Sequence, residues 1–405
     1  MIKIGLLADG FMEWNGGIDF LLNIHNSLLR VNAASDIVVI VPRDGLKWRA
    51  KNALRAVSQM RRGVQKKFYG STSSSPSANA IAAFSAVSGR EYVVDVSRTW
   101  RSINSIVEKE KIEVLLPSFR VLPDQVRVPW IGYLYDLQHR YLTTLFSENE
   151  KKAREKHFRA MIESKRHILV NSRAVKEDLI QLYGADAFRV IVLPFNGAAP
   201  EAWFALKPES VAEKYNIGMR YFIICNQFWK HKDHGTAFRA FASLADRVPN
   251  VCLVCTGSTF DYRDPGYFQE LMRFVSSARL QSKIRILGLI PKLDQIALMR
   301  GAIAVLQPTL FEGGPGGGAV FDAIAVGSRA IVSDIKVNRE LEDPRVRFFK
   351  ASDAGSLLNE LMIHIESCEE HVSCPPSECV QEGVARQAMC GETIMSALYK
   401  IQNDF

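Results

Sequence analysis

A glycine-rich stretch between two acidic side chains is the part of the sequence best suited to chemistry. Residues 302–306 form an apolar run typical of a buried strand, and a series of glycines around Pro315 follows before a helix that we expect to begin near Ala319. Glycine lets backbone N–H groups approach a ligand closely, and the first turn of a helix carries roughly half a positive charge. The loop therefore suits a diphosphate.

Glu312 and Asp322 flank this loop. A carboxylate repels a neighbouring phosphate, whereas it readily accepts hydrogen bonds from hydroxyl groups. Acidic residues on both sides of a diphosphate loop therefore indicate a ligand that carries both phosphates and hydroxyls. A nucleotide-sugar combines the two.

The same segment also fits a dinucleotide-binding fingerprint. Gly314, Gly316 and Ala319 have the G-x-G-x-x-A spacing, and Asp334 closes the next expected strand. In that fingerprint the first glycine follows its strand almost directly, whereas residues 307–313 intervene here. An NAD(P)-dependent oxidoreductase is therefore the weaker alternative. A surface turn without a ligand is weaker still, because so many glycines lose ordering entropy for no gain.

Two lysines follow another expected strand at residues 221–225. Lys230 and Lys232 lie just past its carboxyl end, and parallel strands bring their carboxyl ends to one edge of a sheet. Ammonium groups there stabilise a departing nucleoside diphosphate as negative charge develops on it. A solvated basic turn is the alternative interpretation.

The first half of the chain offers two further candidate groups. Gly16 and Gly17 enter a helix after the first expected strand, and Asp136 and His139 follow the carboxyl end of a later one. A lone histidine is more often structural than catalytic. An aspartate and a histidine together after a strand favour a functional role.

Strand-like runs alternate with helical segments along nearly the whole chain. This alternation predicts an α/β protein with parallel sheets that are covered on both faces. The runs form two sets separated by a proline-rich stretch at residues 194–208, so we expect two Rossmann-like domains that face each other across a cleft. The expected strands are residues 2–7, 37–41, 114–116, 130–135, 168–170 and 190–193 in the first set, and 221–225, 251–256, 284–287, 302–306 and 330–332 in the second.

Length and composition agree with this organisation. A chain of 405 residues is too long for one hydrophobic core, and 47% hydrophobic with 23% charged residues is ordinary for a globular protein. We expect an acceptor-side domain at residues 1–200 and a nucleotide-sugar-binding domain at residues 201–385. A C-terminal helix at residues 386–405 is expected to pack back toward the first domain.

The sequence predicts a cytoplasmic protein. No apolar run reaches the ~20 residues of a membrane span, and the N-terminus enters a strand directly. An odd number of cysteines, seven, agrees with a reducing compartment. Cys252 and Cys255 imitate a C-x-x-C motif, but strand alternation places them on opposite faces. Four cysteines near the C-terminus lack the paired spacing of a zinc site: Cys368, Cys374, Cys379 and Cys390.

Several of these motifs agree in order and spacing with a known family. Over most of its length the chain resembles retaining GT-B glycosyltransferases of family four, particularly the mannosyltransferase-like branch. The resemblance implies transfer of a hexose, with mannose favoured, from a nucleoside-diphosphate sugar to a glycan or lipid-linked acceptor, with retained anomeric configuration and without a metal or other cofactor. A non-catalytic module that binds sugar-nucleotides is a further alternative. The motifs are Gly16-Gly17 and residues 136–139, 226–234, 288–291, 311–322 and 333–334.

The resemblance also implies roles for individual residues of the second half. Glu312 would contact hydroxyls of the donor sugar, and Asp322 would contact the ribose. Lys232 would neutralise the diphosphate, assisted by Lys230 or Gln227. The backbone of Leu289 and Ile290 would hold the base, and the loop amides would contact the sugar or diphosphate. Those amides belong to Gly316, Gly317, Gly318 and Ala319.

In the first half, the resemblance implies a donor-side role for Gly16 and Gly17, and a role for His139 with Asp136 in positioning donor or acceptor. The chain departs from the family pattern at several points. Many relatives separate the acidic pair by eight residues with Glu second, whereas Asp322 follows Glu312 by ten. Gln227 stands where many have Arg, and Tyr135 stands where many have His.

Residues 43–68 hold the charge asymmetry of the chain. Nine basic residues face one acid there, which gives +8, the same as the formal net charge of the whole chain. Apolar residues recur at three- and four-residue spacing, which predicts an amphipathic helix that binds an anionic membrane and holds the protein on its inner face. Packing on the first domain and binding of a polyanion are the alternatives. We do not expect nucleic acid as a partner, because no recognition motif accompanies the charge.

Overall fold

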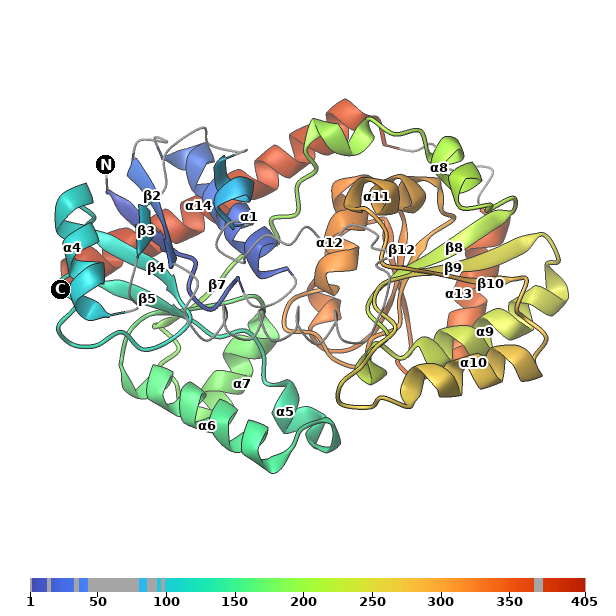
Figure 1. Cartoon of the computed structure of the whole chain (residues 1–405), viewed down its shortest axis with the longest axis horizontal. Helices are drawn as coiled ribbons and strands as arrows, with labels where there is room; N and C mark the ends of the chain where they lie inside the picture. The colour runs from blue at the N-terminus through green and yellow to red at the C-terminus, as the bar shows by residue number, and fades with distance from the viewer. Residues whose placement is uncertain are drawn as a thin grey trace, which may run out of the picture.

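A computed structural model describes residues 2–12, 16–32, 36–42, 80–85, 93–95, 99–367 and 374–404. They form two Rossmann-like α/β domains, each built on a parallel sheet with flanking helices, which confirms the predicted fold class (Figure 1). The predicted amphipathic helix at residues 43–68 lies outside the described residues.

The sheet of the first domain contains seven strands in the order β3-β2-β1-β4-β5-β6-β7, and every neighbouring pair is parallel. Strands β1, β4 and β5 are buried along their whole length, as expected for a parallel sheet covered on both faces. The strands are β1 (Ile4–Leu7), β2 (Ile37–Pro42), β3 (Val93–Asp95), β4 (Val114–Ser118), β5 (Trp130–Tyr133), β6 (Ile168–Val170) and β7 (Val190–Val192). The helices are α1 (Gly17–Val31), α4 (Trp100–Glu110), α5 (Gln138–Tyr141), α6 (Glu148–Glu163) and α7 (Arg173–Tyr183).

The sheet of the second domain contains six parallel strands in the order β10-β9-β8-β11-β12-β13. The sequence did not predict β13, a short edge strand in which only the two end residues are buried. The strands are β8 (Arg220–Cys225), β9 (Val251–Thr256), β10 (Ile284–Gly288), β11 (Val305–Gln307), β12 (Ala330–Ser333) and β13 (Val346–Phe349). The helices are α8 (Pro208–Lys214), α9 (His234–Arg247), α10 (Tyr267–Ser277), α11 (Lys292–Gly301), α12 (Gly317–Ala325) and α13 (Ala354–Glu366).

Two apolar clusters cover the two faces of the second sheet. Cys255 packs in the cluster that includes Phe238 and Leu361, whereas Cys252 packs in the cluster that includes Ile296 and Ala323. Both thiols are buried and free, and burial raises the pKa of Cys252 to about 11. The prediction that these cysteines are core residues on opposite faces is therefore confirmed.

The strand order reverses direction between β1 and β4 in the first sheet and between β8 and β11 in the second. At such a point the helices that follow the two central strands lie on opposite sides of the sheet and leave a crevice beyond the carboxyl ends. The loops after β1, β4, β8 and β11 are therefore the places where a ligand is expected.

The last helix, α14 (Pro376–Asp404), crosses from the second domain to the first and lies beside α1 (Figure 1). It begins earlier than residue 386, the predicted start. Cys390, Ile394 and Leu398 are buried in the core of the first domain. Gly391 permits the contact, because an ideal Cβ on it would lie 2.2 Å from the carbonyl oxygen of Ser27. In the described part of the chain, no helix combines the length and the apolar character needed to span a bilayer.

Candidate active site

Lys232 and Glu312 form an ion pair at the reversal point of the second sheet. The Lys232 ammonium group bonds to Oε1 of Glu312, and the two side chains are only 14% and 11% exposed. Lys232 follows β8 and Glu312 follows β11, two adjacent strands. Asp233 fixes the backbone after Lys232, because it adopts a left-handed conformation and caps α9 through the N–H of Thr236.

Glu312 also lies against the first turn of α12. An ideal Cβ on Gly317 would stand 2.9 Å from Oε2 of Glu312, and the positive φ of Gly317 favours glycine at this position. Gly316 and Gly317 both have positive φ, at 73° and 62°, and the helix has no side-chain cap. The partial positive charge of the helix N-terminus therefore favours negative charge at this position.

The loop amides divide into two groups. The N–H of Gly316 donates to Oδ1 of Asn338 at 2.8 Å, and the N–H of Gly317 donates to the carbonyl of Gly314 at 3.2 Å. The prediction that the amides of Gly316 and Gly317 face a ligand is therefore wrong, because both N–H groups form hydrogen bonds within the protein. Gly318 is exposed in the first turn of α12, followed by the buried Ala319, so these two amides remain the candidates.

Asp322, the second predicted carboxylate, bonds to Lys292 at the start of α11. Burial raises the pKa of Asp322, while Lys292 acts to lower it. Sequence reasoning missed Lys292. The sequence did contain a clue to Lys292. It is a basic residue in the first turn of a helix, where the helix dipole disfavours positive charge, and it follows Gly288, which has a positive φ, by four residues.

Leu289 and Ile290 lie between β10 and α11, at the carboxyl edge of the second sheet. The Leu289 side chain is 70% exposed, and Ile290 packs partly into the core. The two residues therefore present backbone and one apolar side chain at the surface, close in sequence to Lys292.

Lys230 points away from the Glu312 pair. Its Nζ bonds to Oδ2 of Asp264 at 2.6 Å, and its N–H donates to Oδ2 of Asp261 at 3.0 Å. The hydrogen bond to Asp264 raises the pKa of Lys230. The prediction that both lysines join one anion site is therefore corrected, because Lys230 is held by two other acids. Within the described part of the chain, the half-buried Gln227 side chain forms no hydrogen bond.

His139 is enclosed within the first domain. Its Nδ1 accepts a hydrogen bond from Nε of Arg154 at 3.2 Å, and its Nε2 lies 2.9 Å from Oε1 of Glu155. Burial lowers the pKa of His139, so the neutral ring carries its proton on Nε2 and donates it to Glu155. Both ring nitrogens are thus engaged. His139 therefore holds Arg154 in place, and its role with Asp136 in positioning donor or acceptor stays a prediction.

Arg154, which sequence reasoning missed, also binds Asp136. Its Nη2 lies 2.5 Å from Oδ1 of Asp136, which accepts a second bond from the N–H of Gln138 at 2.9 Å. Asp136 lies close to the glycine loop, since an ideal Cβ on Gly313 would stand 3.0 Å from its Cβ. The structure therefore brings Asp136 to the loop that carries Glu312, and places His139 behind it.

The first turn of α1 also faces the second domain. Gly16 precedes α1 in a left-handed conformation, and the buried Gly17 is its first residue. Asp19, in the first turn, acts electrostatically to raise the pKa of Asp322. At the reversal point of the first sheet, Asp9 after β1 forms an ion pair with Arg120 after β4. The sequence did not predict this pair.

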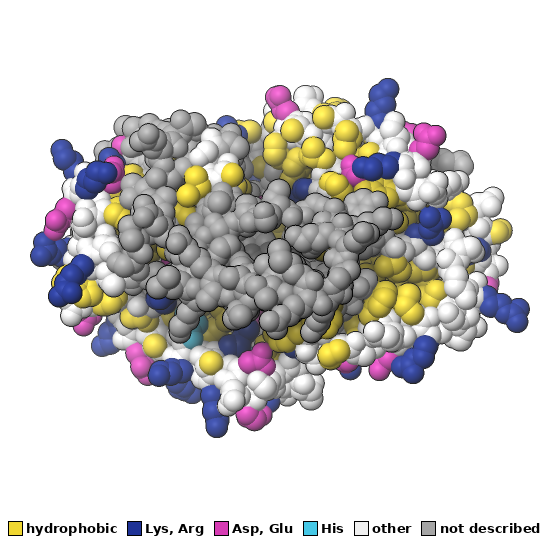
Figure 2. Space-filling model, in the orientation of Figure 1, with side chains coloured by type: hydrophobic (Ala, Val, Ile, Leu, Met, Phe, Trp, Pro, Cys, Tyr) yellow, Lys and Arg dark blue, Asp and Glu magenta, His cyan; other side chains and the backbone are white. Residues whose placement is uncertain are grey.

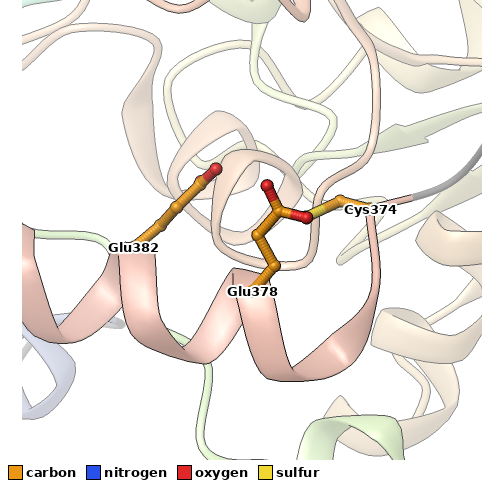
Figure 3. A group of neighbouring side chains, drawn as sticks. All are labelled: Cys374, Glu378 and Glu382. Carbon is orange, nitrogen blue, oxygen red and sulfur yellow. The ribbon is translucent and has the colours of Figure 1, made fainter.

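Among the described residues, Cys374, Glu378 and Glu382 form the one group of three His, Cys, Asp or Glu side chains with possible metal-ligand atoms within 4.8 Å of one another (Figure 3). Glu382 also binds Arg345 at 2.7 Å and Arg386 at 3.1 Å, and two guanidinium groups disfavour a cation there. Cys390 lies about 16 Å further along α14 than Cys379. None of these residues contacts Glu312 or Lys232, and Cys368 lies outside the described residues.

Residues 209–373 match the family model "Glycosyl transferases group 1". The chain is also similar in structure to Anabaena HepE in complex with UDP and glucose, with a TM-score of 0.65, 14% identity and coverage of 99% of this chain and 100% of that one. The family match concerns the second domain, and the structural likeness shows that the chain has the GT-B fold.

Two other solved structures agree with this GT-B assignment. Sucrose-phosphate synthase from Thermosynechococcus elongatus has a TM-score of 0.62 at 12% identity, with 100% of both chains covered. WaaG, a glycosyltransferase involved in lipopolysaccharide biosynthesis, has a TM-score of 0.55 at 14% identity, with 96% of this chain and 95% of that one covered. No curated protein matches the sequence.

Proposed function

We propose that this GT-B protein is a retaining, metal-independent hexosyltransferase that moves a sugar, with mannose favoured, from a nucleoside-diphosphate donor to a glycan or lipid-linked acceptor. The observation that carries the proposal is the Lys232–Glu312 pair against the first turn of α12. One site then offers an ammonium group and a helix N-terminus for phosphates, and a carboxylate for sugar hydroxyls.

Lys232 has the leaving-group role in this proposal. When the bond between the sugar and the diphosphate breaks, the second phosphate gains negative charge. The Lys232 ammonium group is largely buried, so its attraction to that charge is stronger than it would be in water. The first-turn amides of Gly318 and Ala319 and the dipole of α12 add to the same stabilisation.

Glu312 has the sugar-orienting role. Its Oε1 is bound by Lys232, while Oε2 stands over Gly317 and is the acceptor for a sugar hydroxyl. Asp322 and Lys292 together offer an acceptor and a donor for the ribose, and Leu289 with Ile290 offers a surface for the base. The UDP and UDP-glucose in the HepE structures support a nucleoside-diphosphate sugar as the donor class.

The first domain is the acceptor side in this proposal. Asp136, held by Arg154, lies next to the Gly313 end of the donor loop and is its candidate polar group for an acceptor hydroxyl. Membrane contact through residues 43–68 would present a lipid-linked acceptor to that domain and would make the cytoplasmic protein peripheral on the inner face of the membrane. Among the described side chains on the face in Figure 2, Lys and Arg lie scattered around the rim and are mixed with acids.

Donor binding is the first test, by thermal unfolding of the full-length protein with a panel of nucleotides, nucleoside-diphosphate hexoses and NAD(P). A donor present at 100 times its Kd stabilises the folded state by about 2.7 kcal/mol. We expect at least one nucleoside-diphosphate hexose to raise the Tm more than any dinucleotide, and to be consumed with transfer when a glycan acceptor is added. Stabilisation by NAD(P) in preference to every nucleotide-sugar would contradict the proposal, and binding without transfer to any acceptor would favour the non-catalytic module.

A further inference from the structure

The buried side-chain amides of Asn226 and Gln307 form a chain of hydrogen bonds that ends at Glu312. Gln307 is completely buried, and its Nε2 donates to Oε1 of Glu312 at 2.8 Å. The Oε1 of Gln307 accepts a hydrogen bond from Nδ2 of Asn226 at 2.5 Å. Neither amide has a role in the family resemblance, and the ligand roles proposed above use neither of them.

The fold fixes both amides. Gln307 is the last residue of β11, and Asn226 directly follows β8, the adjacent strand. Gly257, with a φ of 125°, packs on the Asn226 backbone so closely that an ideal Cβ would stand 2.2 Å from its carbonyl oxygen. A buried amide is costly unless its polar atoms are bonded, so this arrangement is stable only while Gln307 has partners at both ends.

Glu312 and Asn226 together fix which way the Gln307 amide faces. The Glu312 carboxylate can only accept, so the amino group of Gln307 turns toward it, and the carbonyl of Gln307 turns toward the amino group of Asn226. The opposite orientation would set the carbonyl oxygen of Gln307 against a carboxylate oxygen, and two acceptors repel each other. By satisfying the carbonyl of Gln307, Asn226 stabilises the orientation in which Gln307 donates to Glu312.

The two oxygens of Glu312 then have different tasks. Oε1 receives both Lys232 and Gln307, and Oε2 stands over the first turn of α12. If the proposed function holds, a bound diphosphate draws the Lys232 ammonium group toward itself. Gln307 is then the remaining side chain, among the described residues, that still binds Oε1.

We propose that Gln307, oriented by Asn226, is a positioning residue that keeps Glu312 directed at the donor sugar after Lys232 has turned to the diphosphate. This inference rests on the proposed function. Gln307 then affects how the sugar is held and does not affect how the diphosphate binds. Measurements of sugar transfer and of nucleoside-diphosphate affinity can therefore be compared.

The test compares Gln307→Leu with Gln387→Leu in the full-length protein. Gln387 is a matched control, since it is also a buried glutamine bonded to a charged partner, Arg30, but it lies on α14 in contact with α1. Loss of one hydrogen bond to a charged group corresponds to about a 10- to 100-fold effect. We expect Gln307→Leu to lower kcat/KM for transfer by that factor, to keep the affinity for the free nucleoside diphosphate within about twofold, and the control to match wild type in both.

A second variant, Gln307→Glu, gives a readout that a structural role would not move. Two carboxyl groups then share one hydrogen bond, which requires a proton on one of them. We expect its transfer rate, relative to wild type, to rise as the pH falls from about 8 to about 5.

Two results would overturn the inference. One is wild-type transfer by Gln307→Leu, or an equal loss of transfer and of nucleoside-diphosphate affinity. The other is a pH-independent ratio of Gln307→Glu to wild type. In both cases the wild-type protein still transfers sugar, so only the inference about Gln307 is wrong. A wild-type protein that binds no nucleotide-sugar would instead overturn the proposed function.

Discussion

At the residue scale, the proposed chemistry of the second domain depends on the ion pair between Lys232 and Glu312. Glu312 and Lys232 were predicted from charge and loop position, and the structure brings them into contact. His139 had the same kind of signal, yet Arg154 and Glu155 occupy both of its ring nitrogens. Those partners lie on α6, more than a dozen residues away along the chain, so no local spacing could predict that His139 is enclosed.

His234 gives a prediction at this scale. It is completely buried and stacks on Phe228 at 4.1 Å, and burial lowers its pKa to about 3. The unfolded chain binds a proton near pH 6.5 and the folded chain does not, so the stability that this histidine contributes is present above pH 6.5 and is lost as the pH falls toward 3. The loss is on the order of several kcal/mol over that window.

Urea unfolding between pH 7 and pH 4 measures this loss. His234→Leu removes the titrating group, so its free energy of unfolding should fall less steeply with decreasing pH than that of wild type. Parallel curves for the two proteins would show that His234 does not titrate in this way.

At the scale of elements, most strands were predicted, and the edge strands β3 and β13 were not. β6 and β9 have the predicted bounds, because all of their residues are buried and, apart from Thr256, apolar. β13 has only four residues, of which the two in the middle are not buried, a pattern that loops also show. α12 begins at Gly317, before the predicted start, since positive φ at two glycines lets the helix begin inside the loop.

A prediction at this scale concerns residues 43–68 and their binding to membranes. If this segment forms the predicted basic amphipathic helix, the full-length protein should bind vesicles of anionic lipid, and the binding should weaken as salt increases, because each basic residue near the surface adds about 1 kcal/mol. Neutralising Arg61, Arg62, Lys66 and Lys67 should abolish the binding. Equal sedimentation with neutral and anionic vesicles would assign the segment to packing on the first domain.

At the scale of the whole molecule, contacts between residues far apart in the sequence bring the two domains together. The Glu340 carboxylate accepts hydrogen bonds from the N–H groups of Arg173 and Ala174 at 2.8 and 2.7 Å, at the positive end of α7. Gly313 meets the Tyr135 backbone so closely that an ideal Cβ would stand 2.4 Å from its carbonyl oxygen. The sequence predicted two domains, but pairings over such separations have no periodicity or motif that reveals them.

The central claim is that Lys232 stabilises the departing nucleoside diphosphate within this arrangement. The most direct test is the rate of sugar transfer by Lys232→Ala, measured beside wild type and Lys214→Ala, whose lysine pairs with Asp294 on the α8–α11 side of the second domain. We predict a loss of about two to three orders of magnitude for Lys232→Ala, the scale of removing one preorganised electrostatic contact, and a near-wild-type rate for Lys214→Ala. Transfer by Lys232→Ala at the wild-type rate would contradict the account.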